Sequence, residues 1–154
     1  CLPRLICSPM EADCGIPTEY FDYVYSIYAV GWTTDLIGTF KRIHSYLKPG
    51  GTFIFSWKHP INGCVAVRDG QLMFHKSYFD ESWEPLSIDG GDILLANRRI
   101  STYVNALADA GFRIERLVEQ TDAQTLHLTG ELTDRVRRAQ MFPLSFAFKA
   151  RKTN

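Results

Sequence analysis

The sequence predicts an α/β fold built on a mostly parallel sheet, and three observations support this prediction. Two runs rich in β-branched and aromatic residues, 21–28 and 52–57, lack the polar alternation of a half-exposed strand, which indicates strands covered on both faces. A helical pattern lies between them. The links are short, so the unit is expected to form a right-handed parallel crossover. The length of 154 residues is that of one domain.

The first helix is predicted directly after the capping-type residues 33–35. Apolar side chains follow there at helical spacing, namely Leu36, Ile37, Phe40, Ile43 and Leu47. The helix is expected to end at Lys48-Pro49-Gly50-Gly51, because Pro49 disfavours helical geometry at Lys48 and glycine permits a tight turn. The second strand, 52–57, comes next.

Residues 61–97 differ in character and are interpreted as an excursion from the sheet. Residues 65–67 and 71–74 flank Asp69-Gly70 and predict a hairpin. Regular structure resumes with a helix whose expected N-cap is Ser101 and whose expected end is at Gly111, in left-handed geometry. A strand at 112–118, a helix at 132–141 and a final strand at 144–149 complete the pattern.

Composition excludes several classes of protein. The 17 basic and 17 acidic residues balance, so no overall field recruits nucleic acid or an anionic membrane. Apolar runs fall well short of the ~20 residues of a membrane span. No secretory leader is visible, and a cytoplasmic location is expected. The four cysteines lack CxxC spacing and paired histidines, so free thiols and no metal site are expected; they are Cys1, Cys7, Cys14 and Cys64.

None of the common catalytic or phosphate-binding motifs occurs in the sequence: there is no GxGxxG, GxxxxGK[ST], GxSxG or HExxH. A glycine-rich first turn that would cradle a nucleotide-like cofactor is also absent from these residues. The pattern therefore indicates most of an α/β sheet without its beginning.

Four motifs, in order, resemble the C-terminal portion of a class I S-adenosylmethionine-dependent methyltransferase of the small-molecule (type 11) kind. Phe21-Asp22-Tyr-Val is similar to the start of the family's fourth strand, and Trp32 with Asp35 to the family's Trp-x-x-Asp before a helix. Leu47-Lys-Pro-Gly-Gly-Thr-Phe-Ile-Phe55 is similar to the family's approach to the fifth strand. Tyr103 through Ala110-Gly111-Phe112 resembles the opening of the sixth.

The resemblance implies a partial Rossmann-like sheet, mostly parallel with an antiparallel final strand, and helices on both faces. Residues 1–154 would form a single truncated domain, and 61–97 would cover the substrate. Leu5–Cys7 resembles the third strand. The family's first two strands, with the glycine-rich loop, would precede it. The family's order, third, second, first, fourth, fifth, seventh, sixth, then leaves the flank of 21–28 bare.

The resemblance also implies where S-adenosylmethionine would bind. Ser8, Met10 and Glu11 lie in the loop that contacts adenine in the family, with Ser8 in place of the usual Asp. Ser26, Ile27 and Trp32 follow at the carboxyl end of the strand 21–28. For Ile27 and Trp32 the alternative is simple packing in the core.

Candidate catalytic and substrate residues follow the same strand ends. Tyr28 and His59 are the catalytic candidates, since a neutral imidazole can accept a proton or orient an acceptor. The alternatives are a core tyrosine and a loop histidine bonded to backbone. Tyr78, Phe79 and Trp83 on the excursion are expected to contact the substrate, or instead to cover the edge of the core.

The predicted function is therefore part of an S-adenosylmethionine-dependent methyltransferase acting on a small molecule, with the fragment inactive alone. The alternative is a non-catalytic α/β module that binds a ligand or subunit. An unpaired apolar strand at a sheet edge is a template for another chain, so a homo-oligomer through residues 5–30 is also predicted.

Overall fold

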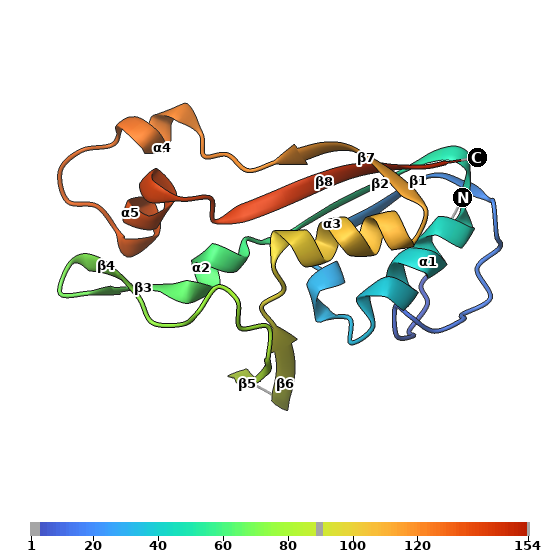
Figure 1. The fold of residues 1–154 in the computed structure, drawn as a ribbon, viewed down its shortest axis with the longest axis horizontal. Helices are drawn as coiled ribbons and strands as arrows, with labels where there is room; N and C mark the ends of the chain where they lie inside the picture. Colours follow the sequence, from blue (N-terminus) through green and yellow to red (C-terminus); the bar gives the residue numbers. More distant parts are fainter. Residues whose placement is uncertain (1–3, 89–90, 154) are drawn as a thin grey trace.

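The computed structural model describes residues 4–88 and 91–153 of the chain (Figure 1). The elements follow in this order: β1 (Phe21–Ile27), the 3-10 turn η1 (Val30–Trp32), α1 (Leu36–Tyr46), β2 (Leu47–Lys58), α2 (Pro60–Cys64), β3 (Val65–Arg68), β4 (Gln71–Phe74), β5 (Trp83–Ile88), β6 (Gly91–Ala96), α3 (Ile100–Asp109), β7 (Phe112–Val118), α4 (Ala123–His127), α5 (Asp134–Met141) and β8 (Ser145–Lys152).

The main sheet has the strand order β1-β2-β8-β7. β1 and β2 run parallel, while β8 pairs antiparallel with both β2 and β7. This is the expected order of the family's fourth, fifth, seventh and sixth strands, and the antiparallel final strand is confirmed. The excursion contributes two separate hairpins, β3–β4 and β5–β6, of which the first is the one that Asp69-Gly70 predicted.

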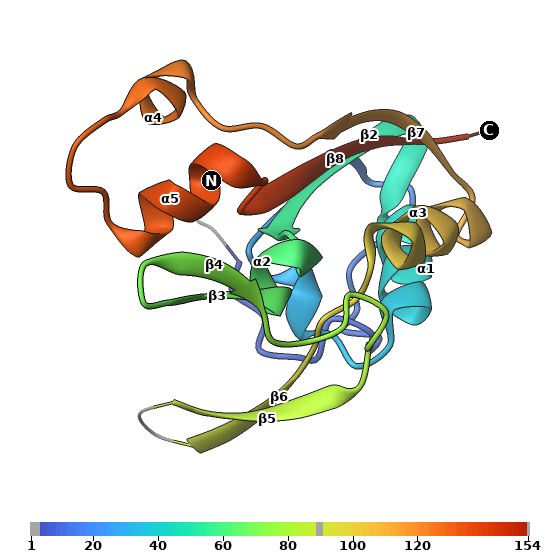
Figure 2. The same ribbon diagram turned by 60° about the vertical axis from the view of Figure 1, so that its left-hand side comes forward.

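The core lies between the sheet and the two long helices α1 and α3, which contact each other on one face (Figures 1 and 2). Alternate residues of β2 and β8 point into this core, including the fully buried Phe53, Phe55 and Phe148. The expected helices on both faces are thus found on one face within the described residues. α2 follows the carboxyl end of β2, and α4 and α5 follow that of β7, instead of packing along the sheet.

The helix ends at Tyr46, before residues 48–51, as expected, but no separate turn follows, because β2 begins directly at Leu47. The register with β1 shifts across these residues, from the pair Phe21–Leu47 to the pair Tyr23–Thr52. Gly50 keeps a positive φ of 74°, which is the conformation a glycine allows, within the irregular start of the strand. Two side chains of β8 hold this segment in place. Arg151 Nη1 donates to the Gly50 carbonyl at 2.7 Å, and Lys152 Nζ donates to the Leu47 carbonyl at 2.9 Å. A contact from a distant strand therefore overrides the local turn signal.

The start of α3 also differs from the prediction. The helix begins at Ile100, with Arg99 rather than Ser101 at the N-cap. Glu81 supplies the cap from the excursion, since one carboxylate oxygen accepts from the Arg99 amide at 2.8 Å and from the Thr102 hydroxyl at 2.6 Å. The helix end at Gly111, with φ 87°, and the strand 112–118 are confirmed.

β1 is an edge strand among the described residues, as the strand order predicted. Leu5–Cys7 form no strand, which corrects the expected third strand, and Leu5 is 93% exposed. Tyr23, Tyr25 and Ile27 share one face of β1 and are 59%, 61% and 67% exposed, while Val24 and Ser26 on the opposite face are half-buried. The expectation that 21–28 is covered on both faces is therefore wrong for this chain. None of the helices in the described ranges is long and apolar enough to cross a membrane.

Candidate functional site

The carboxyl ends of three parallel strands meet at one edge of the sheet. β1, β2 and β7 share a direction, and the pairing sets Ile27, Ser56, Ala147 and Val118 in one row across the sheet. Tyr28 and Glu119 come next after this row, and His59 follows the end of β2. Ligands of open α/β sheets bind at such an edge, which makes it the candidate site of this chain.

An aromatic cluster marks the end of β1. Tyr28 has a positive φ of 50°, unusual for a non-glycine residue, while its amide still donates to the Ser56 carbonyl at 3.0 Å. The rings of Tyr28 and Trp32 both contact Trp57, at centroid distances of 5.8 and 5.3 Å. Strained residues of this kind cluster at functional sites.

A first cavity, of about 510 Å³, lies along β1 and is called here the β1 cavity. Its walls come from β1, from α1 and from the segment 6–16, and they are mainly apolar. It brings together four of the residues expected to bind the cofactor: Ser8, Met10, Ser26 and Ile27. Flat apolar walls of this kind suit the faces of an adenine ring.

Glu11 and Trp32, also expected to bind the cofactor, do not line the β1 cavity. The Glu11 carboxylate accepts hydrogen bonds from the Thr34 hydroxyl at 2.7 Å and the Thr33 hydroxyl at 3.2 Å. The bond from Thr34 is the main cause that holds the pKa of Glu11 below its usual range. In this arrangement Glu11 ties the loop 8–12 to the segment before α1 and so positions one wall of the cavity.

His59 is buried and paired with a residue that the sequence analysis did not single out. Its Nδ1 accepts from the Ile61 amide at 3.2 Å as the N-cap of α2, and its Nε2 lies 2.6 Å from Glu119 Oε1. A second cavity of about 460 Å³, called here the His59 cavity, is lined by His59, Ile61, Tyr78, Ile100, Glu119 and Pro143. Of the three aromatic residues expected to contact the substrate, Tyr78 alone reaches it.

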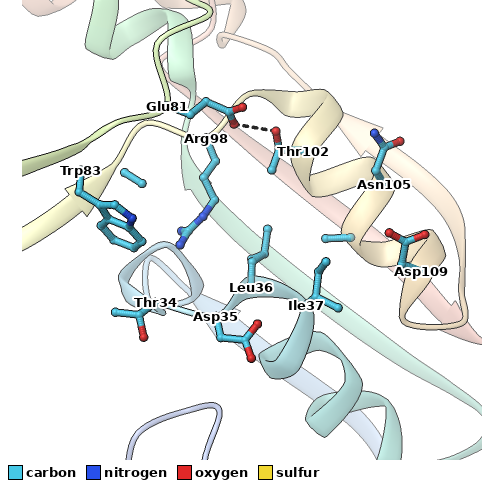
Figure 3. Close-up of a pocket in the computed structure, with 12 residues that line it drawn as sticks. Thr34, Asp35, Leu36, Ile37, Glu81, Trp83, Arg98, Thr102, Asn105 and Asp109 are labelled. Carbon is cyan, nitrogen blue, oxygen red and sulfur yellow. Dashed lines mark hydrogen bonds between the residues drawn. The ribbon is translucent and has the colours of Figure 1, made fainter.

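Trp83 does not line the His59 cavity. It lines a third cavity with Thr34, Asp35 and Asn105, and its ring lies 5.2 Å from the guanidinium carbon of Arg98 (Figure 3). Arg98 is buried and donates to the carbonyls of Gly31 and Thr33. The excursion is therefore fixed to the end of β1 by a buried cation. Phe79 is 76% exposed and touches the ring of Tyr78.

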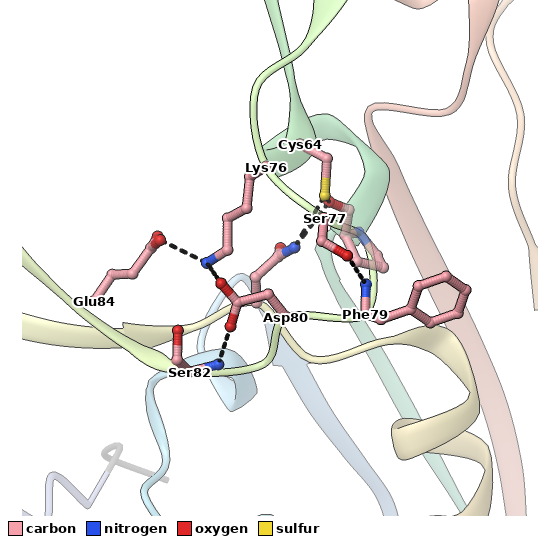
Figure 4. A network of polar contacts seen from close by, with 9 residues as sticks. Cys64, Lys76, Ser77, Phe79, Asp80, Ser82 and Glu84 are labelled. Atoms are coloured by element: carbon pink, nitrogen blue, oxygen red, sulfur yellow. Dashed lines mark hydrogen bonds and ion pairs between the residues drawn. The ribbon is translucent and has the colours of Figure 1, made fainter.

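A polar network within the excursion surrounds Lys76 and Asp80 (Figure 4). The side chain of Lys76 is 10% exposed and pairs with Glu84 at 2.5 Å and Asp80 at 3.8 Å. Asp80 also accepts from the Ser82 amide, and Ser77 from the Phe79 amide. These contacts hold the loop that carries Tyr78 and Phe79 in one conformation. Tyr78 of this loop lines the His59 cavity.

The residues missed by sequence reasoning are Glu119, Trp57 and Arg98. Glu119 carried a usable signal, because it directly follows the predicted strand 112–118 at the ligand-binding edge. Trp57 and Arg98 did not, since their partners lie far away in sequence. In the described part of the chain no three His, Cys, Asp or Glu residues are grouped to hold a metal ion. Cys7, Cys14 and Cys64 are free thiols, and Cys1 lies outside the described residues.

Comparison with known proteins points to one family. Residues 2–55 match the family model described as a methyltransferase domain. An uncharacterised protein of Haemophilus influenzae is 27% identical over 94% of this chain, and the sterol 24-C-methyltransferase erg6 of Aspergillus fumigatus is 31% identical over 70% of it. The chain spans 59% of the first relative's length and 26% of the second's.

The structural match is broader. The crystal structure of an S-adenosylmethionine-dependent methyltransferase from Mesorhizobium loti is similar over 94% of this chain and 67% of its own, with a TM-score of 0.74 and 26% identity. This confirms the fold that the four sequence motifs implied.

Proposed function

Because the chain has the fold of the class I S-adenosylmethionine-dependent methyltransferases, we propose that it forms part of an enzyme that moves a methyl group from S-adenosylmethionine to a small molecule. The observation that carries this proposal is a pair of cavities, one along β1 and one beyond the carboxyl ends of β2 and β7. The β1 cavity is on the side expected for the cofactor, and the His59 cavity is on the side expected for the acceptor.

The cofactor's adenine is assigned to the β1 cavity. Met10 and Ile27 offer apolar surface, while Ser8 and Ser26 offer hydroxyl groups. The Ser26 hydroxyl already accepts from the Val30 amide at 3.0 Å, so it shapes the end of β1 as well as facing the cavity. Glu11 and Trp32 support this site through the contacts of the loops around it. When bound, S-adenosylmethionine supplies an electrophilic methyl group.

The acceptor is assigned to the space around Tyr28, His59 and Tyr78, with Phe79 and Trp83 on the surrounding excursion. Methyl transfer depends largely on alignment of the two reactants, and such positioning is worth roughly 7–11 kcal/mol in favourable cases. An enzyme of this kind needs no nucleophile of its own. The mainly apolar lining, and the sterol substrate named for one relative, support an apolar acceptor.

We expect the 154-residue chain to be a poor catalyst alone, because the glycine-rich loop that grips the cofactor in the resemblance is not among its residues. Calorimetric titration of the chain with S-adenosylmethionine should give no micromolar affinity. A form of the protein that also carries that loop should bind the cofactor and transfer its labelled methyl group to a small molecule. Failure of that longer form to bind the cofactor would contradict the proposed function.

Self-association is proposed through the exposed edge of β1. Full burial of an apolar side chain such as Ile27 is worth roughly 1.5–3 kcal/mol, and edge strands recruit further strands. A homodimer whose interface includes residues 5–30 would cover this edge. The free thiols Cys7, Cys14 and Cys64 support a reducing, cytoplasmic location.

A further inference from the structure

The lining of the His59 cavity combines apolar side chains with one carboxylate. The cavity is open to the surface, and its lining includes the apolar side chains of Ile61, Ile100 and Pro143 and the ring of Tyr78. Glu119 is the charged carboxylate among the lining residues, and the lining contains no lysine or arginine. The cavity is therefore an apolar space with one anionic acceptor of hydrogen bonds.

The hydrogen bonds of His59 determine which carboxylate oxygen of Glu119 remains available to accept a hydrogen bond from a ligand. Because Nδ1 accepts from the Ile61 amide, the ring proton is placed on Nε2, which then donates to Glu119 Oε1 at 2.6 Å. The side chain of His59 is 9% exposed, so the imidazole has little surface for a ligand. The side chain of Glu119 is 36% exposed, and its second oxygen has no donor among the described residues.

The same bond places the carboxylate where an acceptor would lie. Glu119 follows β7, two strands away from β2, yet its carboxylate contacts His59 at the end of β2. That end is next to the end of β1, where Tyr28 contacts Trp57. His59 thus acts as a positioning residue that holds Glu119 at the centre of the edge.

We propose that the His59 cavity binds an uncharged, largely apolar small molecule through one O–H or N–H group, which donates to the free oxygen of Glu119. Glu119 is then the specificity-determining residue for the acceptor. This inference rests on the proposed function for its biological meaning, although binding itself can be measured without the cofactor. A carboxylate ligand would meet Glu119 as a like charge, and the lining offers no lysine or arginine to compensate, so such a ligand should bind much more weakly.

Tyr78 contributes an aromatic ring to the lining of the His59 cavity. Its hydroxyl oxygen accepts from the Ile100 amide at 3.4 Å, which fixes the ring beside the start of α3. An apolar ligand can stack on this ring while its polar group reaches Glu119. Phe79, in contact with Tyr78, extends the apolar surface outward.

The test uses the 154-residue chain labelled with ¹³C at the isoleucine methyl groups. Three probes of one shape are titrated: 4-propylphenol, 4-propylbenzoate and propylbenzene. We expect 4-propylphenol to shift the methyl signals of Ile61 and Ile100 saturably, while the core residue Ile114 is unaffected. The benzoate should bind much more weakly than the phenol, and propylbenzene should fall between them.

Variants separate recognition from structural support. Glu119→Ala should weaken phenol binding roughly tenfold, the usual effect of losing a charge-assisted hydrogen bond. Glu119→Gln retains an oxygen for His59 but loses the charge, so it should reduce the preference for phenol over benzoate. Glu131→Gln, at an exposed residue outside the cavity, is the matched control and should change neither value.

Three results would overturn the inference: no phenol-induced shift of Ile61 and Ile100, equal phenol affinity in Glu119→Ala, or benzoate binding as tight as phenol binding. Thermal unfolding of each variant shows whether it is still folded. If Glu119→Ala is unfolded, the ratio of phenol to benzoate affinity in folded Glu119→Gln tests the inference in its place. Selective phenol binding together with no methyl transfer in the longer protein would instead refute the proposed function and leave this ligand site standing.

Discussion

Gly31 and Trp57 are in such close contact that position 31 has no room for a side chain. A Cβ atom built on Gly31 would lie 1.8 Å from Trp57 Cε2, inside the indole ring. Trp57 in turn contacts Trp32 and Tyr28, and the Gly31 carbonyl accepts from buried Arg98. The end of β1, the end of β2 and the excursion are therefore joined at one point.

Gly31→Ala should lower the free energy of unfolding by about 1–3 kcal/mol, the usual cost of overpacking a well-filled site. Urea unfolding followed by circular dichroism measures this value. In a Trp57→Phe background the smaller ring leaves space, so the same substitution should cost clearly less. Equal costs in the two backgrounds would show that the contact with Trp57 is not the cause.

Replacement of His59 tests its two structural bonds. His59→Ala removes the N-cap of α2 and the contact with Glu119, and should cost about 1 kcal/mol or more of stability. His59→Asn keeps a capping side chain and should cost less. In the longer protein, His59→Ala should lower turnover with little change in cofactor affinity. Unchanged turnover with reduced stability would assign His59 a purely structural role.

A charge on the β1 edge should prevent self-association. Tyr25→Lys places a cation on an exposed edge residue, and like charges on two paired edges repel. Light scattering at tens of micromolar should find an oligomer for the unmodified chain and a monomer for Tyr25→Lys. Leu94→Lys on β6, at a side chain of similar exposure, is the control and should leave the oligomer intact. A stable monomer of the unmodified chain would contradict the prediction.

Glu115 should make stability depend on pH in the acid range. Hydrogen bonds from Arg151 and Lys149 lower its pKa from 4.5 to about 2 in the folded chain. A lowered pKa adds stability above the unfolded value of 4.5, and this contribution is lost as pH falls from there toward 2. The difference in unfolding free energy between the unmodified chain and Glu115→Gln should therefore be larger at pH 7 than at pH 3.

The matched control for this measurement is again Glu131→Gln, an exposed glutamate with no ion pair among the described residues. Its effect should be the same at both pH values. Because Glu115 is at the surface, 1 M salt should reduce its contribution at pH 7. A Glu115→Gln effect that is independent of pH and salt would contradict the assignment.

The sequence predicted those elements whose signals are local. The strand 112–118 was predicted with its observed bounds, and the hairpin at Asp69-Gly70 followed from a two-residue turn between apolar runs. The left-handed end of α3 at Gly111 followed from the need of that geometry for glycine. In each case the residues that determine the structure lie within the element itself.

The features that were not predicted have the opposite cause, because residues far away in the sequence determine them. The segment 47–51 forms the irregular start of β2, where Arg151 of β8 binds the Gly50 carbonyl and Lys152 binds the Leu47 carbonyl. The cap of α3 came from Glu81 on the excursion instead of Ser101. At the site, Ser8, Met10, Ser26 and Ile27 were predicted as a group from family motifs. The His59–Glu119 contact joins residues 60 positions apart. The place of Glu119 after the strand 112–118 could have marked it as a site candidate, but not as the partner of His59.

The place of β8 in the sheet has a consequence for biosynthesis. Of the strands described, β8 is the last to be synthesised, yet it lies between β2 and β7 and pairs with both. As the polypeptide leaves the ribosome, Phe55 emerges long before Phe146 and Phe148, whose rings pack against it. The nascent chain must therefore expose an aromatic, aggregation-prone surface until Ser145–Lys152 have left the ribosome. A stop codon anywhere before Ser145 would leave that surface permanently open and make the product a target for chaperones and proteases.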